Sequence, residues 1–240
     1  MIAPAAVPVR SVAWTGARRI IRSLYPPIDL FEDIADPADW PLLLSAEQKT
    51  NPRLMETIGT LDLVPLDRRV GGPGASFLMA PFTHVSPDRQ SRFSDGRFGV
   101  LYAARGFETA LAETIHHHQC FMRRTREPAG WTSQFREIVL DVRLDAHDLR
   151  DDDRFASLLD PDSYQASQAL ALTLHDAGSE GIAYPSVRLA GGECVALFYP
   201  DLAAHPVQGR HLDYHWNGDR VDLYRDLGSG AVYRIAQPVE

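Results

Sequence analysis

The stretch RFSDGRFGVLYAARGFETALAE, residues 92–113, changes its hydrophobic period half-way along and so indicates two different elements. Residues 99–103 (GVLYA) are rich in β-branched and aromatic side chains, which favours a strand. From Phe107 onward, apolar side chains recur at near-helical spacing among residues of high helix propensity, which predicts a helix over 107–124. The stretch therefore predicts a strand that is followed directly by a helix.

The chain beyond this stretch mixes further strands with one more helix. Short or alternating apolar runs indicate the strands, a serine and a glycine mark the ends of the helix, and an Asn-Gly pair between alternating runs predicts a hairpin with a type I′ turn. These elements are strands at 135–144, 181–184 and 194–199, a helix from Ser163 to Gly178, and a hairpin over 211–225 centred on Asn217-Gly218. Their order predicts an α+β fold with a mixed or mainly antiparallel sheet.

A glycine-rich run, GGPGA at 71–75, lies upstream of these elements. We interpret it as a tight turn that enters a short apolar strand over 76–80. A dinucleotide-binding loop needs a helix directly after it to receive the phosphates, so this run predicts an ordinary turn.

The first 65 residues predict an N-terminal helical arm, because prolines divide this part of the chain into short helical stretches. Asp36-Pro37 has the residue types of a helix N-cap followed by the first helical position. Thr50-Asn51-Pro52 predicts the start of another short helix in the same way.

The composition is that of an acidic chain with almost no lysine. Lys49 is the one lysine among 24 basic residues, and the formal net charge is −8, which argues against a protein that coats nucleic acid. No apolar run is long enough for a membrane span, and the N-terminal residues lack the pattern of a secretory signal. Two cysteines suit a reducing compartment, so we expect a cytoplasmic protein.

Three side chains of the opening stretch are candidates for chemistry. Arg92 offers a guanidinium, Tyr102 a phenol on the predicted strand, and Glu113 a carboxylate on the predicted helix, so that all three could line one cleft. An ion pair between Arg92 and Glu113 on the surface explains two of them equally well. Ser186 follows a predicted strand, and loops at strand ends are common places for ligand contacts.

A histidine run, His116-His117-His118, precedes Cys120 on the predicted helix. His116 and Cys120 share one helix face, as a pair of metal ligands would. Three adjacent histidines point in three directions, however, and no second cluster supplies further ligands, so we predict no metal site.

Taken together, these motifs resemble the RES-domain family, the toxin half of RES/Xre toxin–antitoxin pairs. The resemblance covers about residues 66–203, and Phe93 stands where the family often has tryptophan. The long N-terminal arm is similar to the longer, ADP-ribosyltransferase-like branch of the family. The matching stretches are GPGA (72–75), SRFSDGRFGVLYAA (91–104), ETALAE (108–113), and GIAYPSVR followed by GGECVALFYP (181–200). On this basis we expect an arm at 1–65, a catalytic core at 66–205, and a C-terminal hairpin at 206–240 that completes the sheet.

The resemblance implies a fold similar to ADP-ribosyltransferases, a split mixed sheet flanked by helices, with NAD⁺ as substrate and no metal. Family members break the bond between nicotinamide and ribose and pass ADP-ribose to a protein side chain, to water or to phosphate. Glu113 would stabilise the positive charge that develops on the ribose. The expected NAD⁺ contacts come from Arg92, Tyr102, Ser186 and Phe93, with Arg92 on a phosphate or the ribose.

The same resemblance implies a partner, an antitoxin of the Xre/ParS type that blocks the cleft and carries the DNA-binding part. A protein substrate is a further expected partner, whereas nucleic acid and membranes are not. The alternative is a catalytically silent RES-fold module that serves only as an antitoxin partner.

Overall fold

The computed structural model describes residues 6–32, 36–47 and 58–236. Its centre is a sheet of eight strands in the order β1-β2-β5-β4-β3-β6-β7-β8, with an additional pairing of β1 to β3. β3 and β4 run parallel and the other described pairs are antiparallel, which confirms the predicted α+β class with a mixed sheet. The strands are β1 (Val9–Arg22), β2 (Leu101–Ala104), β3 (Trp131–Asp148), β4 (Gly181–Pro185), β5 (Glu193–Leu197), β6 (Ala203–Trp216), β7 (Val221–Asp226) and β8 (Val232–Arg234).

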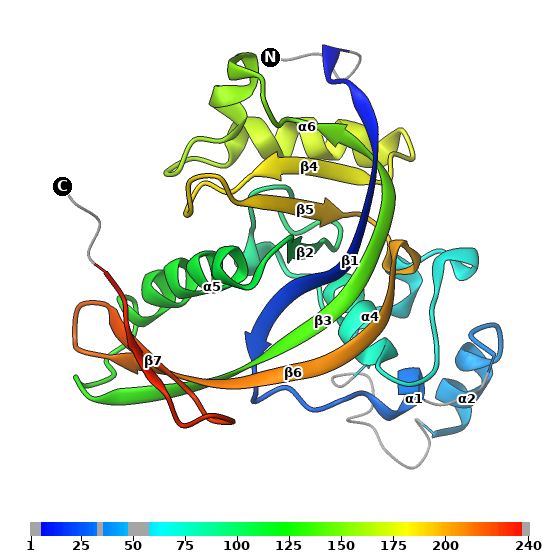
Figure 1. Ribbon diagram of the computed structural model, residues 1–240. Helices are drawn as coiled ribbons and strands as arrows, with labels where there is room; N and C mark the ends of the chain where they lie inside the picture. Colours follow the sequence, from blue (N-terminus) through cyan, green and yellow to red (C-terminus); the bar gives the residue numbers. More distant parts are fainter. Residues whose placement is uncertain (1–5, 33–35, 48–57, 237–240) are drawn as a thin grey trace.

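The sheet is split into a group of long curved strands and a group of short ones (Figure 1). β1, β3 and β6 bend together, while β2, β5 and β4 lie across the concave side of that bend (Figure 1). β1 pairs with β3 along its length and also meets β2 at Arg18 and Ala104. Hydrogen-bonded neighbours therefore form a ring that runs from β1 through β2, β5, β4 and β3 back to β1.

Helices flank both faces of this sheet, as expected. One hydrophobic core lies under α5 and α6 and includes Phe107 and Leu174, and a second lies under α1, α2 and α4 and includes Trp40 and Met79. The helices are α1 (Asp29–Glu32), α2 (Trp40–Glu47), α4 (Ala75–Thr83), α5 (Phe107–Met122) and α6 (Gln165–Asp176), and the short 3₁₀ turns are η2 (Leu61–Leu63), η3 (Leu66–Arg68), η4 (Pro87–Arg89), η5 (Asp153–Leu158) and η6 (Pro200–Leu202).

The predicted helices over 107–124 and from Ser163 to Gly178 are confirmed as α5 and α6. The N-cap of α6 is Tyr164, one residue after the predicted serine. Gly178 takes a left-handed conformation with a φ of 76° just past the end of α6, which is the role that glycine usually has there.

The prediction of a purely helical N-terminal arm is wrong, because Val9–Arg22 is the strand β1. A register shift between Trp14 and Ala17 interrupts the pairing with β3, and Gly16 lies there with a φ of 72°. This bulge breaks the alternation of apolar residues that would otherwise indicate a strand. The short helices α1 and α2 follow β1, and the predicted helix start at Thr50-Asn51-Pro52 lies outside the described residues.

The predicted strand over 76–80 is also wrong, because this segment belongs to α4. Gly74 precedes the helix with a φ of 82°. The Glu32 carboxylate accepts hydrogen bonds from the backbone N–H groups of Gly74 (2.5 Å) and Ser76 (2.9 Å) and so occupies the N-terminus of α4. A helix thus follows the glycine-rich run after all, but a side chain of the same chain fills the place where a phosphate would bind.

The predicted hairpin is confirmed as β6 and β7, but its turn is not a two-residue type I′ turn. Trp216 pairs with Val221, so that four residues form the connection. The side-chain oxygen of Asn217 accepts hydrogen bonds from the N–H groups of Asp219 (3.0 Å) and Arg220 (2.9 Å). Asn217 therefore stabilises a loop that is longer than the two-residue turn predicted from the Asn-Gly dipeptide.

Candidate functional site

A cavity of about 300 Å³ opens between β1, β2 and α5. Three of the four predicted catalytic residues lie on its wall. The lining includes Arg92, Tyr102 and Glu113 together with Arg18, Arg19, His117, Tyr164, Tyr184 and Cys194.

Glu113 projects from α5, and Ser186 holds its carboxylate in place. The hydroxyl of Ser186 donates a hydrogen bond of 2.6 Å to Oε1 of Glu113. The same hydroxyl oxygen accepts the backbone N–H groups of Arg188 and Leu189, both at 3.1 Å. With its only proton given to the carboxylate, Ser186 acts through Glu113, and its side chain lies behind the cavity wall.

Arg92 does not form an ion pair with Glu113, so the hypothesis of a surface pair between them is wrong. Arg92 is only 8% exposed, and its Nη1 donates to the backbone carbonyls of Asp160 (2.8 Å) and Leu158 (3.4 Å). Its guanidinium also lies over the ring of Tyr164, 4.7 Å from the centroid. Arg92 thus connects the loop before α6 to the cavity.

Tyr102 reaches the cavity from β2, and hydrogen bonds fix its phenol. The phenolic oxygen accepts the N–H of Phe93 at 2.9 Å and shares a hydrogen bond of 2.8 Å with the Ser91 hydroxyl. Burial raises the pKa of Tyr102 to about 12, so the phenol is neutral at physiological pH.

Phe93 lies in the core behind the cavity and not on its wall. Its side chain is fully buried and meets the ring of Tyr184 edge-on, with 4.9 Å between the ring centroids. The structure therefore gives Phe93 a supporting position behind Tyr102 and Tyr184, in place of the expected contact with the substrate.

The sequence reasoning missed two arginines of the cavity, Arg18 and Arg19, because both come from β1. Arg19 donates from Nη1 to the backbone carbonyl of Tyr102 at 3.0 Å, and burial lowers the pKa of Arg19 to about 10. Arg18 forms an ion pair of 3.2 Å with Glu137, whose side chain is 3% exposed. A predicted strand over residues 9–22 would have placed these two side chains on the sheet.

The histidines of the run lie in different surroundings, and Cys194 lies apart from them on the cavity wall. His117 lines the cavity one turn after Glu113, and burial is the main cause that lowers its pKa. His118 instead packs against Phe135, with 5.0 Å between the ring centroids. Burial raises the pKa of Cys194 far above its ordinary value, so its thiol stays protonated. Among the described residues, no group of three or more His, Cys, Asp or Glu side chains is arranged to hold a metal ion.

Comparison with known families gives the context for this cavity. The sequence model of the RES domain matches residues 66–217, which is more than half of the chain. The chain belongs to the RES domain family. Arg92, Tyr102, Glu113 and Ser186 all lie inside the matched part of the RES domain, whereas β1 with Arg18 and Arg19 lies outside it.

Two proteins are similar to this chain over most of its length. The uncharacterized protein y4oC of Sinorhizobium fredii (strain NBRC 101917 / NGR234) is 28% identical over 211 residues, which are 85% of this chain and 84% of that protein. The crystal structure of the M. tuberculosis MbcT–MbcA toxin–antitoxin complex contains a chain with 12% identity and a TM-score of 0.45, and the match covers 86% of this chain and 89% of that one. None of the described helices is both long and apolar enough to span a membrane.

Proposed function

We propose that this RES-domain protein is the toxin of a toxin–antitoxin pair and cleaves the bond between nicotinamide and ribose in NAD⁺. One observation carries the proposal. A carboxylate, Glu113, is held by Ser186 beside a cavity whose other charged lining groups are arginines. A single oriented carboxylate among cationic groups suits a substrate that combines phosphates with a reacting centre that becomes positive.

The first step breaks the bond between C1′ of the ribose and the pyridinium nitrogen. The bonding electrons leave with nicotinamide, which departs as a neutral molecule and needs no proton from an acid. Positive charge then develops on C1′ and the ring oxygen, as in glycoside hydrolysis. The carboxylate of Glu113 stabilises this charge more in the transition state than in the ground state, which accelerates the step.

The second step forms a bond from C1′ to an acceptor atom, and the acceptor releases its proton to the solvent. The acceptor is a protein side chain, water or phosphate. The phenol of Tyr102 and the ring of Tyr184 offer aromatic surface to nicotinamide, because both tyrosines line the cavity.

The toxin role also implies a protein partner. The resemblance to RES/Xre pairs supports an antitoxin of the Xre/ParS type that covers the cavity and carries the contact with DNA. The formal charge of −8 agrees with a toxin that does not itself bind nucleic acid. Co-purification with the protein encoded beside it, and loss of activity in that complex, would support this part of the proposal.

The experiment that tests the activity measures the nicotinamide released from NAD⁺. A label in the adenylate part of NAD⁺ follows the ADP-ribose to its acceptor. The purified protein is incubated alone, with phosphate, and with a cell lysate. Release in buffer alone gives water as acceptor, release that needs phosphate gives phosphate, and label on a protein band gives a transferase. No release under any of these conditions contradicts the proposal and leaves the silent binding module.

A further inference from the structure

The three arginines that line the cavity differ in what they already bind. Arg18 faces Glu137 at 3.2 Å, and Glu137 also accepts the backbone N–H of Arg210 at 3.1 Å. Arg92 contacts two backbone carbonyls and the ring of Tyr164. Arg19 donates to the carbonyl of Tyr102 and forms no ion pair with a carboxylate among the described residues. Arg19 is therefore the lining cation whose charge is least compensated.

The guanidinium of Arg19 has hydrogen-bond donors left for a ligand. A guanidinium has five N–H donors in a planar fork, and the described contacts of Arg19 use one of its nitrogens. Burial lowers its pKa to about 10, which reflects the loss of water around the charge. Arg19 is partly buried and lines the cavity, so its remaining N–H donors face a space that an anion from outside the chain can enter.

The charged side chains that line the cavity are mostly cationic, although the protein as a whole is acidic. The chain carries a formal charge of −8, yet the charged groups of the cavity lining are Arg18, Arg19, Arg92 and the single carboxylate Glu113. Arg18 shares Glu137 with Arg210, whereas Arg19 and Arg92 have no described carboxylate partner, so excess positive charge remains on this wall. Planar guanidinium groups bind the oxygens of carboxylates and phosphates in pairs. Two arginines on one wall match the two negative charges of a diphosphate better than the single charge of a carboxylate.

We propose that Arg19 binds the diphosphate of the substrate, and that β1 is therefore a working part of the site although it lies outside the matched RES domain. The choice of NAD⁺ as the dinucleotide rests on the proposed function, whereas the diphosphate contact rests on Arg19 itself. Arg92, which the resemblance assigns to a phosphate, has its Nη1 engaged by the loop before α6.

Binding of ADP-ribose to the full chain, followed by calorimetry at fixed salt, tests this contact. ADP-ribose carries the diphosphate and has no nicotinamide to lose. Arg19→Gln is expected to weaken its binding about 10- to 100-fold, the range for loss of a charge-assisted contact. Arg10→Gln is the matched control, because Arg10 lies on the same strand, is exposed beside Asp148 at 3.6 Å and does not line the cavity.

Equal affinity of the wild type and Arg19→Gln overturns the proposal, as does an equal loss in both variants, which would indicate a general field effect. Absence of ADP-ribose binding by the wild type overturns it as well. As a second readout, Arg19→Gln should raise KM for NAD⁺ and leave kcat nearly unchanged. If the wild type binds ADP-ribose through Arg19 and releases no nicotinamide, the proposed function fails while the diphosphate contact stands.

Discussion

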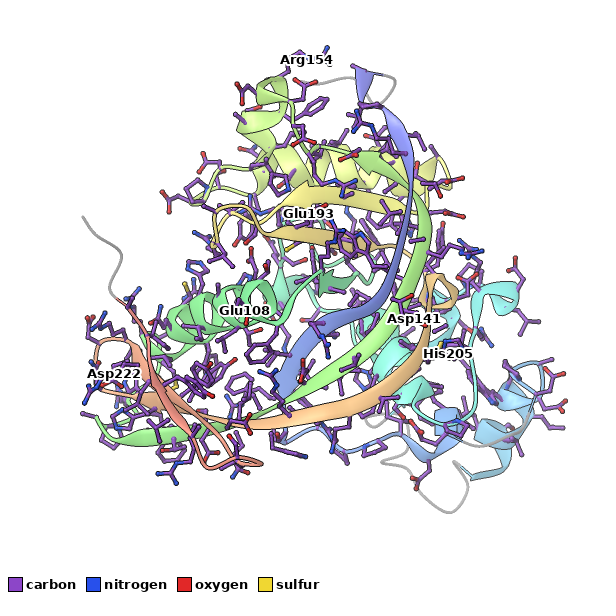
Figure 2. The ribbon with its side chains drawn as sticks, in the orientation of Figure 1. Glu108, Asp141, Arg154, Glu193, His205 and Asp222 are labelled. Atoms are coloured by element: carbon purple, nitrogen blue, oxygen red, sulfur yellow. The ribbon has the colours of Figure 1, made fainter. Side chains whose placement is uncertain are left out.

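Two cavities border β1, and they differ in the charged groups of their linings. The second cavity, of about 370 Å³, is lined by residues that include Trp14, Asp141, Asp201 and His205. Asp141 accepts the N–H of Gly16 at 2.9 Å and contacts Nδ1 of His205 at 3.0 Å. Figure 2 shows Asp141 and His205 close together where β3 and β6 curve.

The difference between the cavities lies in how their charges are compensated. In the larger cavity both carboxylates have partners, since Asp141 contacts His205 and Asp201 pairs with Arg68 at 2.7 Å. Its exposed Arg143 has no described ion pair, so the cavities differ in their carboxylates. In the smaller cavity Arg19 has no described carboxylate partner, and Glu113 is oriented by a hydroxyl instead of being neutralised by a cation. The smaller cavity thus combines an oriented carboxylate with arginines, whereas both carboxylates of the larger cavity already have partners. On this difference, and not on volume, we place the proposed reaction in the smaller cavity.

The largest effect is expected at Glu113. Glu113→Gln keeps the size of the side chain and an oxygen that can accept the Ser186 hydroxyl, but removes the negative charge. We expect kcat for nicotinamide release to fall about 10²- to 10³-fold, as for other losses of transition-state stabilisation, with the thermal stability unchanged. Activity close to that of the wild type would show that the smaller cavity is not the reactive one.

A smaller effect is expected at Ser186, which positions Glu113. Ser186→Ala removes the hydrogen bond of 2.6 Å to the carboxylate, and we expect kcat to fall roughly 10-fold. Ser186→Thr restores a hydroxyl and should recover part of the rate. A pure rise in KM without a change in kcat would instead assign Ser186 to substrate binding.

Tyr102 tests how far the cavity wall depends on its hydrogen bonds. Tyr102→Phe leaves the N–H of Phe93 without its acceptor and the Ser91 hydroxyl without its partner, so the free energy of unfolding should fall by about 1–3 kcal/mol. Tyr233→Phe, at a side chain that is 47% exposed, is the control and should leave stability unchanged. Urea unfolding of the three proteins measures the difference, and equal midpoints would contradict the role given to Tyr102.

No effect on activity is expected from a substitution in the larger cavity. Asp141→Ala should leave nicotinamide release unchanged and lower Tm. The N–H of Gly16, and then His205, lower the pKa of Asp141 in the folded protein. Stability from this carboxylate is thus present above its unfolded pKa of about 3.9 and is lost as the pH falls through the lower folded value. The Tm difference from the wild type should shrink below about pH 4, and a loss of activity in this variant would reverse the assignment of the cavities.

Local sequence features predicted much of this fold. The helix over 107–122 and the strand before it follow from a clear change of period, and these two elements place Tyr102 and Glu113 on one cavity. The segment 75–83 was misread because a short apolar run does not distinguish a buried helix from a strand, and Pro81 lies inside it. β1 was missed because the bulge at Gly16 interrupts its alternation.

The contacts that define the site lie beyond the reach of local patterns. Ser186 meets Glu113 across 73 residues of sequence, and Arg19 meets Tyr102 across 83. Family resemblance supplied Ser186 as a site residue but not its partner. Arg19 carried no motif at all, and only the closure of the sheet from β1 to β2 brings it to the cavity.

A crystal structure of Glu113→Gln, frozen soon after soaking with NAD⁺, tests the central claim most directly, since this variant should bind the dinucleotide and cleave it only slowly. The account predicts intact NAD⁺ in the smaller cavity, with C1′ of the nicotinamide ribose beside residue 113 and the diphosphate on Arg19. NAD⁺ seated against Asp141 and His205 in the larger cavity, or no NAD⁺ in either cavity at saturating concentration, would contradict it.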